Sequence, residues 1–198
     1  MNKKMMFIFA IICIIVFIIF YYIFYISGNN IIRNQKEFVE DIFEKFEKYE
    51  ANIDVIITSN KNENKYNINQ YVDGENSKLV INSPENVNGL EIEIKDNNLK
   101  ITNKKTDMEK IYDDYKVIIK NSLFIDSFIE EFKEFPVEMY ETDNEIVIKM
   151  NLEKNKNTYI KFKELYLNKE TGMPTKLVIK DNNQKINTSI IYNDMKIK

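Results

Sequence analysis

The chain lacks histidine and tryptophan, and it has only one cysteine, three prolines and four glycines among its 198 residues. Histidine is the commonest general base and the commonest metal ligand, so its absence excludes most familiar catalytic and metal sites. The single cysteine, Cys13, lies in an apolar segment, which leaves the rest of the chain without a thiol nucleophile or a disulfide framework. We therefore predict a protein that is not an enzyme, with no catalytic residue, no cofactor and no metal ligand.

Paired carboxylates are the remaining source of acid–base chemistry. Asp113 and Asp114 are adjacent, as are Glu130 and Glu131, and such pairs can cleave glycosides. Both pairs lie among alternating charges, which is typical of solvated faces. Acidic and basic residues are mixed along the chain and the formal net charge is only −3, so no basic stripe indicates nucleic acid as a partner.

An unbroken apolar run extends from residue 5 to residue 26. Such a run is long enough for a helix to cross the roughly 30 Å hydrocarbon core of a bilayer. Lys3 and Lys4 precede it, and short basic N-terminal tails stay in the cytoplasm. The sequence therefore predicts an uncleaved signal anchor, whose anchoring residues are Met5, Phe9, Phe17, Tyr21, Tyr22 and Tyr25.

This anchor determines the expected organisation and location. We expect a single-pass protein of the cell membrane with its N-terminus in the cytoplasm and its C-terminal domain outside. The expected parts are a cytoplasmic tail over residues 1–4, a transmembrane helix over 5–27, a tether over 28–34 and an extracytoplasmic domain over 35–198.

Cys13 offers an alternative, because bacterial lipoproteins are acylated at a cysteine near the N-terminus. Their signal peptidase needs a small residue just before that cysteine, whereas Ile12 is bulky and the apolar run continues well past Cys13. The pattern favours an unmodified apolar cysteine in a helix, with lipidation as the less favoured interpretation.

Two helices and about ten strands are expected after the tether. Apolar residues recur at helical spacing over 35–49 and 122–135, and the second helix starts at Ser122 and ends before Pro136. Period-two alternation predicts strands around 51–58, 66–72, 78–82, 90–95 and 99–103, and then over 137–141, 145–152, 158–167, 175–180 and 185–192.

These elements predict an α+β fold. A long curled antiparallel sheet, open like half a barrel, would carry the two helices on its concave apolar face. Six phenylalanines are expected to face that hollow, where they either pack as core or line a lipid pocket. They are Phe38, Phe43, Phe46, Phe124, Phe128 and Phe132.

The C-terminal part carries a resemblance to a known family. Strand residues 165–167 are followed by Glu170, Gly172 and Pro174, and then by strands over 177–179 and 186–192. This order resembles the second half of proteins with the LolA-like, lipoprotein-carrier fold. Within that family the clostridial germination lipoprotein GerS is most similar, through "SPEN-x-x-G" at 83–89 and "NSLFIDSFIEEF" from residue 121. The resemblance covers nearly all of residues 36–198.

The resemblance implies an incomplete barrel wrapped around helices and a non-enzymatic role. We expect an accessory factor of germination or sporulation that binds and regulates a cell-wall (cortex peptidoglycan) amidase, in the forespore or spore membrane. The alternative is a lipid or lipoprotein binding protein that uses the apolar hollow. A void of several hundred Å³ in that hollow would favour lipid. A sensor is disfavoured, because residues 1–4 are too short to signal, and the choice between monomer and dimer stays open.

Overall fold

The computed structural model describes residues 14–22, 36–74, 76–96, 98–113, 123–152 and 160–198. The chain divides into two compact units, Met1–Asp41 and Ile42–Lys198. Within the described residues of the first unit, helix covers 14–22 and 36–41. The second unit holds the sheet and the remaining helices.

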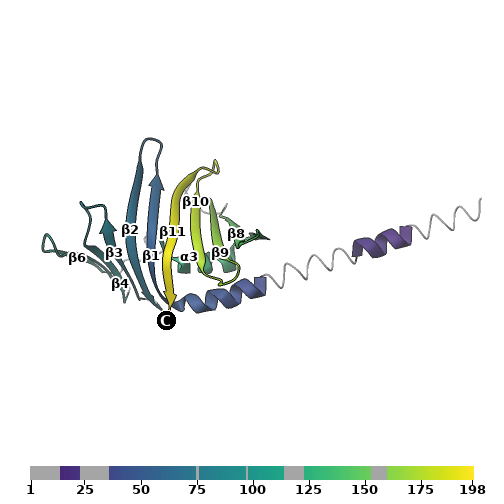
Figure 1. The fold of residues 1–198 in the computed structure, drawn as a ribbon, viewed down its shortest axis with the longest axis horizontal. Coiled ribbons are helices and arrows are strands. Elements are labelled where there is room, and N and C mark those ends of the chain that lie inside the picture. The colour runs from purple at the N-terminus through teal and green to yellow at the C-terminus, as the bar shows by residue number, and fades with distance from the viewer. Residues whose placement is uncertain (1–13, 23–35, 75, 97, 114–122, 153–159) are drawn as a thin grey trace, which may run out of the picture. The chain divides into compact units, whose positions relative to one another are not determined.

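The second unit is built on one antiparallel sheet, shown in Figure 1. Its eleven strands in the described residues lie in the order β6-β5-β4-β3-β2-β1-β11-β10-β9-β8-β7. Their bounds are β1 Lys48–Thr58, β2 Glu63–Asp73, β3 Asn76–Ser83, β4 Leu90–Lys95, β5 Asn98–Asn103, β6 Met108–Tyr112, β7 Val137–Glu141, β8 Glu145–Asn151, β9 Phe162–Asn168, β10 Pro174–Lys180 and β11 Ile186–Ile197.

Most neighbouring strands are hairpin partners, so the sheet consists of two meanders, β1–β6 and β7–β11. The pairing of β1 with β11 joins them. Its register runs from Tyr49 opposite Ile197 to Ile57 opposite Thr188, with an irregularity after Asn52. The first and last strands of the unit therefore lie side by side at the centre of the sheet (Figure 1).

One face of the sheet is buried. Along β1 buried residues alternate with partly exposed ones, so that Tyr49, Ala51, Ile53 and Val55 share one face. The helix α3, Ile125–Glu134, lies on this inner face, behind the central strands in Figure 1. The side-chain amide of Gln70 on β2 donates to the carbonyl of Leu123 at 2.9 Å, just before α3 begins.

The expected antiparallel sheet is present, and β4 and β7 have the predicted bounds. The helix predicted over 35–49 is shorter than expected, because α-helix ends at residue 43 and the 3₁₀ helix η1, Glu44–Glu47, leads directly into β1. Tyr49 belongs to β1, where it pairs with Val72 and Ile197. Period-two burial begins at Tyr49, so strand pairing overrides the helical spacing there.

Two further differences concern the ends of elements. The strand β6 was not predicted; it lies at an edge of the sheet and four of its five residues are exposed, so its apolar alternation is weak. The residue preceding α3 is Phe124, which makes no side-chain capping bond. The expected cap, Ser122, lies outside the described residues.

The predicted transmembrane helix is wrong. No helix in the part of the chain that the structure describes is both long and apolar enough to cross a bilayer. Within the expected anchor the structure describes residues 14–22, which are helical. The predicted single-pass localisation, with a cytoplasmic tail and an extracytoplasmic domain, depended on that helix and is also wrong. Residues 5–13 and 23–27 lie outside the described residues.

Gly172, in the turn between β9 and β10, generates a stability prediction. Its φ is +70°, and a Cβ placed there would lie 3.1 Å from two side-chain atoms of Ile42. Ile42 is 4% exposed. We expect Gly172→Ala to lower the free energy of unfolding by about 2–4 kcal/mol, through backbone strain and overpacking together, as measured by urea denaturation.

Gly74 provides the matched control. Its φ is +59°, but a Cβ there would meet nothing within 4 Å. Gly74→Ala should therefore cost only the backbone strain, about 1–2 kcal/mol. Equal losses in the two variants would show that the contact with Ile42 contributes nothing.

Candidate functional site

Five of the six expected phenylalanines form a buried aromatic cluster on the inner face, each between 0% and 6% exposed. We call this set the aromatic cluster: Phe43, Phe46, Phe124, Phe128 and Phe132. The ring of Phe43 lies edge-on to Phe132, with centroids 5.1 Å apart, and edge-on to Phe128 at 6.3 Å. Edge-to-face contacts at these distances are favourable beyond the area they bury. The cluster therefore holds α3 against the segment that contains Phe43 and η1.

The sixth phenylalanine, Phe38, is 48% exposed and belongs to the first unit. The other five are buried as core side chains are, and ring contacts join Phe43 to Phe46, Phe128 and Phe132. The role of all six as the lining of a ligand hollow stays a prediction.

A buried ion pair ties α3 to the sheet. The ammonium of Lys163 on β9 contacts the carboxylate of Glu131 on α3, and their side chains are 1% and 20% exposed. Burial lowers the pKa of Lys163 and raises the pKa of Glu131, and the attraction between the two opposes each shift without cancelling it. The pair thus lies in a setting that penalises both charges, and its mutual attraction offsets only part of that penalty.

A second buried polar group lies beneath the first turn of α3. Burial raises the pKa of Tyr49 and of Tyr192, and the charge of Asp126 raises both further. The hydroxyl of Tyr192 has no hydrogen-bond partner among the described residues, and the backbone of Ile125 opposes part of the rise in the pKa of Tyr49. Both phenols are therefore neutral at physiological pH and act as core side chains with a polar tip.

Two open grooves lie at opposite ends of β1. The first, which we call the acidic groove, has a volume of about 570 Å³. It is lined by Phe43, Glu44, Phe46, Glu47, Gly74, Asp126, Ile129 and Glu130. Four of its eight lining residues are carboxylates, and none is basic. The groove thus combines an apolar floor with a negative rim.

The second groove, which we call the isoleucine groove, has a volume of about 780 Å³. It lies between the β1–β2 and β10–β11 hairpins, and its apolar lining residues are Ile57, Ile160, Ile179 and Ile186. Lys61, Asp181 and Lys185 are among its polar residues. The ammonium of Lys185 donates to the side-chain oxygen of Asn60 at 3.0 Å and thereby links the two hairpins. Both grooves fall in the volume range of ligand pockets.

The remaining expected site residues are not brought together. Phe17, Tyr21 and Tyr22 lie in the helix over 14–22 and are 79%, 71% and 64% exposed. The other anchor residues and the alternative lipidation site lie outside the described residues: Met5, Phe9, Tyr25 and Cys13.

The carboxylate pair on α3 is divided between two environments, since Glu130 lines the acidic groove while Glu131 contacts Lys163. Within the described ranges, no three residues of the types histidine, cysteine, aspartate and glutamate are placed to hold a metal ion.

Sequence reasoning missed both grooves and the ion pair. Glu44, Glu47 and Glu130 look like ordinary wet-face residues of amphipathic helices, and Lys163 lies beside Glu164 in a strand with mixed charges. Only the strand register shows that Lys163 faces inward, opposite the buried Ile179. The spacing Glu44–Glu47 and Asp126–Glu130 was the one available signal, because residues three or four apart share a helix face.

The ion pair predicts a double-mutant result. Lys163→Met should lower the free energy of unfolding by about 3 kcal/mol, because it leaves the carboxylate of Glu131 buried without its partner. The double variant Glu131→Leu with Lys163→Met should recover wild-type stability to within about 1 kcal/mol or exceed it. Lys100→Met is the control: the partners Lys100 and Glu109 are 39% and 52% exposed, so this change should cost less than about 1 kcal/mol.

The pH dependence of the Lys163→Met variant follows from the same shift. The folded pKa of Glu131 is raised above its ordinary value of 4.5, so the folded chain binds this proton more tightly than the unfolded chain. The contribution of Glu131 to stability is therefore greatest at low pH and is lost as pH rises through that window. The deficit of the variant should shrink on going from pH 7 to about pH 4; a constant deficit would contradict this assignment.

Comparisons with known proteins indicate the family of the chain. A family model described as "Sporulation protein YdcC-like" matches residues 3–198. No curated protein matches the chain.

Several solved structures are similar to the chain at low sequence identity. An uncharacterized conserved protein from Thermus thermophilus has 10% identity and a TM-score of 0.56, over 83% of this chain and 88% of that chain. The structure of the CwlD amidase from Clostridioides difficile in complex with the GerS lipoprotein gives 19% identity and a TM-score of 0.54, over 82% and 95%. The LolA superfamily protein NE2245 from Nitrosomonas europaea has 14% identity and a TM-score of 0.43, over 81% and 93%. The first two likenesses show the fold, and the expected resemblance to the LolA-like family near GerS is confirmed.

Proposed function

The chain belongs to the family of YdcC-like sporulation proteins, and we propose that it works without catalysis, by binding and regulating a cell-wall amidase that acts on cortex peptidoglycan. Two facts about its relatives support this proposal. The family description refers to sporulation. A structure of similar fold, covering 82% of this chain, contains the GerS lipoprotein in complex with the CwlD amidase.

The packing of the aromatic cluster is the observation that carries the proposal. A lipid carrier needs open space between the helices and the sheet, yet here five rings occupy that space with at most 6% exposure. The ring of Phe43 fills the position between η1 and α3, with Phe46, Phe128 and Phe132 around it. Rings buried to this degree favour a filled core over an open cavity for an acyl chain beneath α3. Binding then has to use surfaces and open grooves, which suits a protein partner.

The direct test is reconstitution with the cortex peptidoglycan amidase of the same organism. We expect the full-length chain and the amidase to co-elute in size-exclusion chromatography and to bind with a Kd in or below the micromolar range, as for a specific interface of standard size. The rate of peptide release from cortex peptidoglycan should change when the chain is added to the amidase.

The chain alone should release nothing, and an amidase of unrelated fold should neither co-elute nor change its rate. Peptidoglycan cleavage by the purified chain, or failure of the amidase to bind it, would contradict the proposal.

The isoleucine groove favours a second candidate, binding of an acyl chain. Its volume of about 780 Å³ is large enough for part of a lipid, and Ile57 and Ile186 expose 42% and 40% of their surface. If this groove binds lipid, Ile57→Ser with Ile186→Ser should weaken binding of a fluorescent fatty acid by about tenfold or more, because the groove loses apolar contact area.

The control variant is Ile111→Ser with Ile197→Ser. These isoleucines are similarly exposed, at 53% and 37%, but do not line the groove. Equal loss in both double variants would indicate nonspecific adsorption of the probe and would dismiss the lipid candidate.

A further inference from the structure

We propose that the acidic groove is the docking site for a short basic and amphipathic segment of the protein partner, in which lysine or arginine residues flank an apolar side chain. This proposal rests on the proposed function, because it takes the occupant to be part of a protein. It adds the location of the contact and the chemistry that recognises it.

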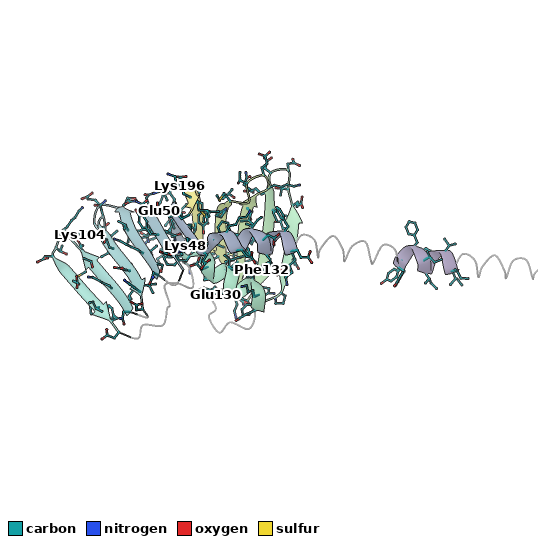
Figure 2. All side chains as sticks on the ribbon, turned by 90° about the horizontal axis from the view of Figure 1, so that it is seen from below. Lys48, Glu50, Lys104, Glu130, Phe132 and Lys196 are labelled. Carbon is teal, nitrogen blue, oxygen red and sulfur yellow. The ribbon has the colours of Figure 1, made fainter. Side chains whose placement is uncertain are left out.

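Two helical segments give the groove its shape. Glu44 and Glu47 are three residues apart on η1, where a 3₁₀ helix places i and i+3 on the same side. Asp126 and Glu130 are four residues apart on α3 and also share a side. All four carboxylates line the groove, so each wall presents two of them. Figure 2 shows Glu130 on α3, two residues before the buried Phe132.

The floor between these walls is apolar. Phe43 and Phe46 line it, although only 6% and 2% of their surface is exposed, and Ile129 contributes a partly exposed side chain. Gly74, in the turn between β2 and β3, also lines the groove, and a Cβ there would meet nothing within 4 Å. The floor therefore offers Ile129 as an apolar contact, with open space above Gly74.

The negative charge of the groove's rim favours a basic segment as the occupant. None of the described residues that line the groove is basic. Glu44 and Glu130 form no ion pair with another described residue, and Lys48, whose charge interacts with Glu47, forms its ion pair with Asp73 at 2.8 Å. Carboxylates gathered around an apolar floor repel one another and attract a cation, which steers a basic segment toward the groove.

The ordinary structural explanation accounts for only part of this arrangement. Asp126 lies in the first turn of α3, where a negative charge stabilises the helix dipole. Glu130 lies beyond that turn, and Glu47 lies at the end of η1, where a negative charge is unfavourable. The partly exposed side chain of Ile129 lies beside these charges.

The test measures binding of a fluorescein-labelled peptide, GKLLKKLG, to the full-length chain by fluorescence anisotropy at low salt. Its glutamate counterpart, GELLEELG, is the control probe. We expect saturable binding of the lysine peptide only, and Glu44→Lys with Glu130→Lys should weaken it by about tenfold or more. In the free chain both positions are exposed, so the fold should tolerate the change. Glu44→Gln with Glu130→Gln repeats the test with a smaller perturbation and should give a smaller loss.

Glu63→Lys with Glu134→Lys is the matched control variant. It changes the net charge by the same amount at two exposed glutamates outside the groove and should leave peptide affinity within about twofold. Ile129→Ser should weaken binding severalfold with no change in net charge. Equal loss in the control variant, or equal binding of the glutamate peptide, would overturn the proposal. So would a change in the sedimentation of the chain in the Glu44→Lys/Glu130→Lys variant without loss of peptide binding, because the groove would then serve self-association.

A second arm separates this proposal from the proposed function. If the amidase binds the wild-type chain and the Glu44→Lys/Glu130→Lys variant equally well, the groove is not the contact and the inference fails while the function stands. If the lysine peptide binds as expected but the amidase does not bind, the groove is supported and the proposed function fails. Loss of amidase binding in this variant but not in the Glu63→Lys/Glu134→Lys control supports both.

Discussion

The pairing of β1 with β11 is the constraint on which the rest of the second unit depends. Each meander alone is a set of local hairpins with an open edge, and open edges invite wrong partners. Nine residue pairs, from Tyr49 opposite Ile197 to Ile57 opposite Thr188, close the two meanders into one sheet. Since side chains alternate along a strand, this register also decides that Tyr49, Ile53 and Tyr192 face inward together. A slip of β11 by one residue would turn Tyr192 outward while Tyr49 and Ile53 still faced inward.

The inner face that this register creates is larger than the helix that covers it. The helix α3 has 10 residues and rises about 15 Å, whereas β1 has 11 residues and extends about 36 Å. The aromatic cluster and the pair of Lys163 with Glu131 fasten α3 to the rest of the unit. The two ends stay open, and there the acidic groove and the isoleucine groove form. The acidic groove lies between η1 and α3, and the isoleucine groove lies between two hairpins.

The two grooves present different chemistry on one scaffold. A negative rim over an apolar floor suits a cationic amphipathic segment, while a cluster of isoleucines suits an uncharged apolar chain. Family membership supports a role in sporulation, and the solved neighbours share the fold at 19% identity or less. Fold alone does not decide function, so the assignment depends on these sites.

The sequence by itself determined the strands and the apolar positions. Period-two alternation located most of the sheet, because half-buried strands have one buried and one exposed side. Helical spacing marked Phe128 and Phe132 as one face of α3, with Phe124 just before it. A long apolar run led to a transmembrane helix that the described residues do not support.

Tertiary structure decided the rest. That Tyr49 is a strand residue, that Lys163 points inward and that Glu44 and Glu130 share a groove all depend on contacts between segments far apart in the chain. Local periodicity reports which face of its own element a residue occupies. It carries no information about which distant element lies opposite, and a groove exists only between elements.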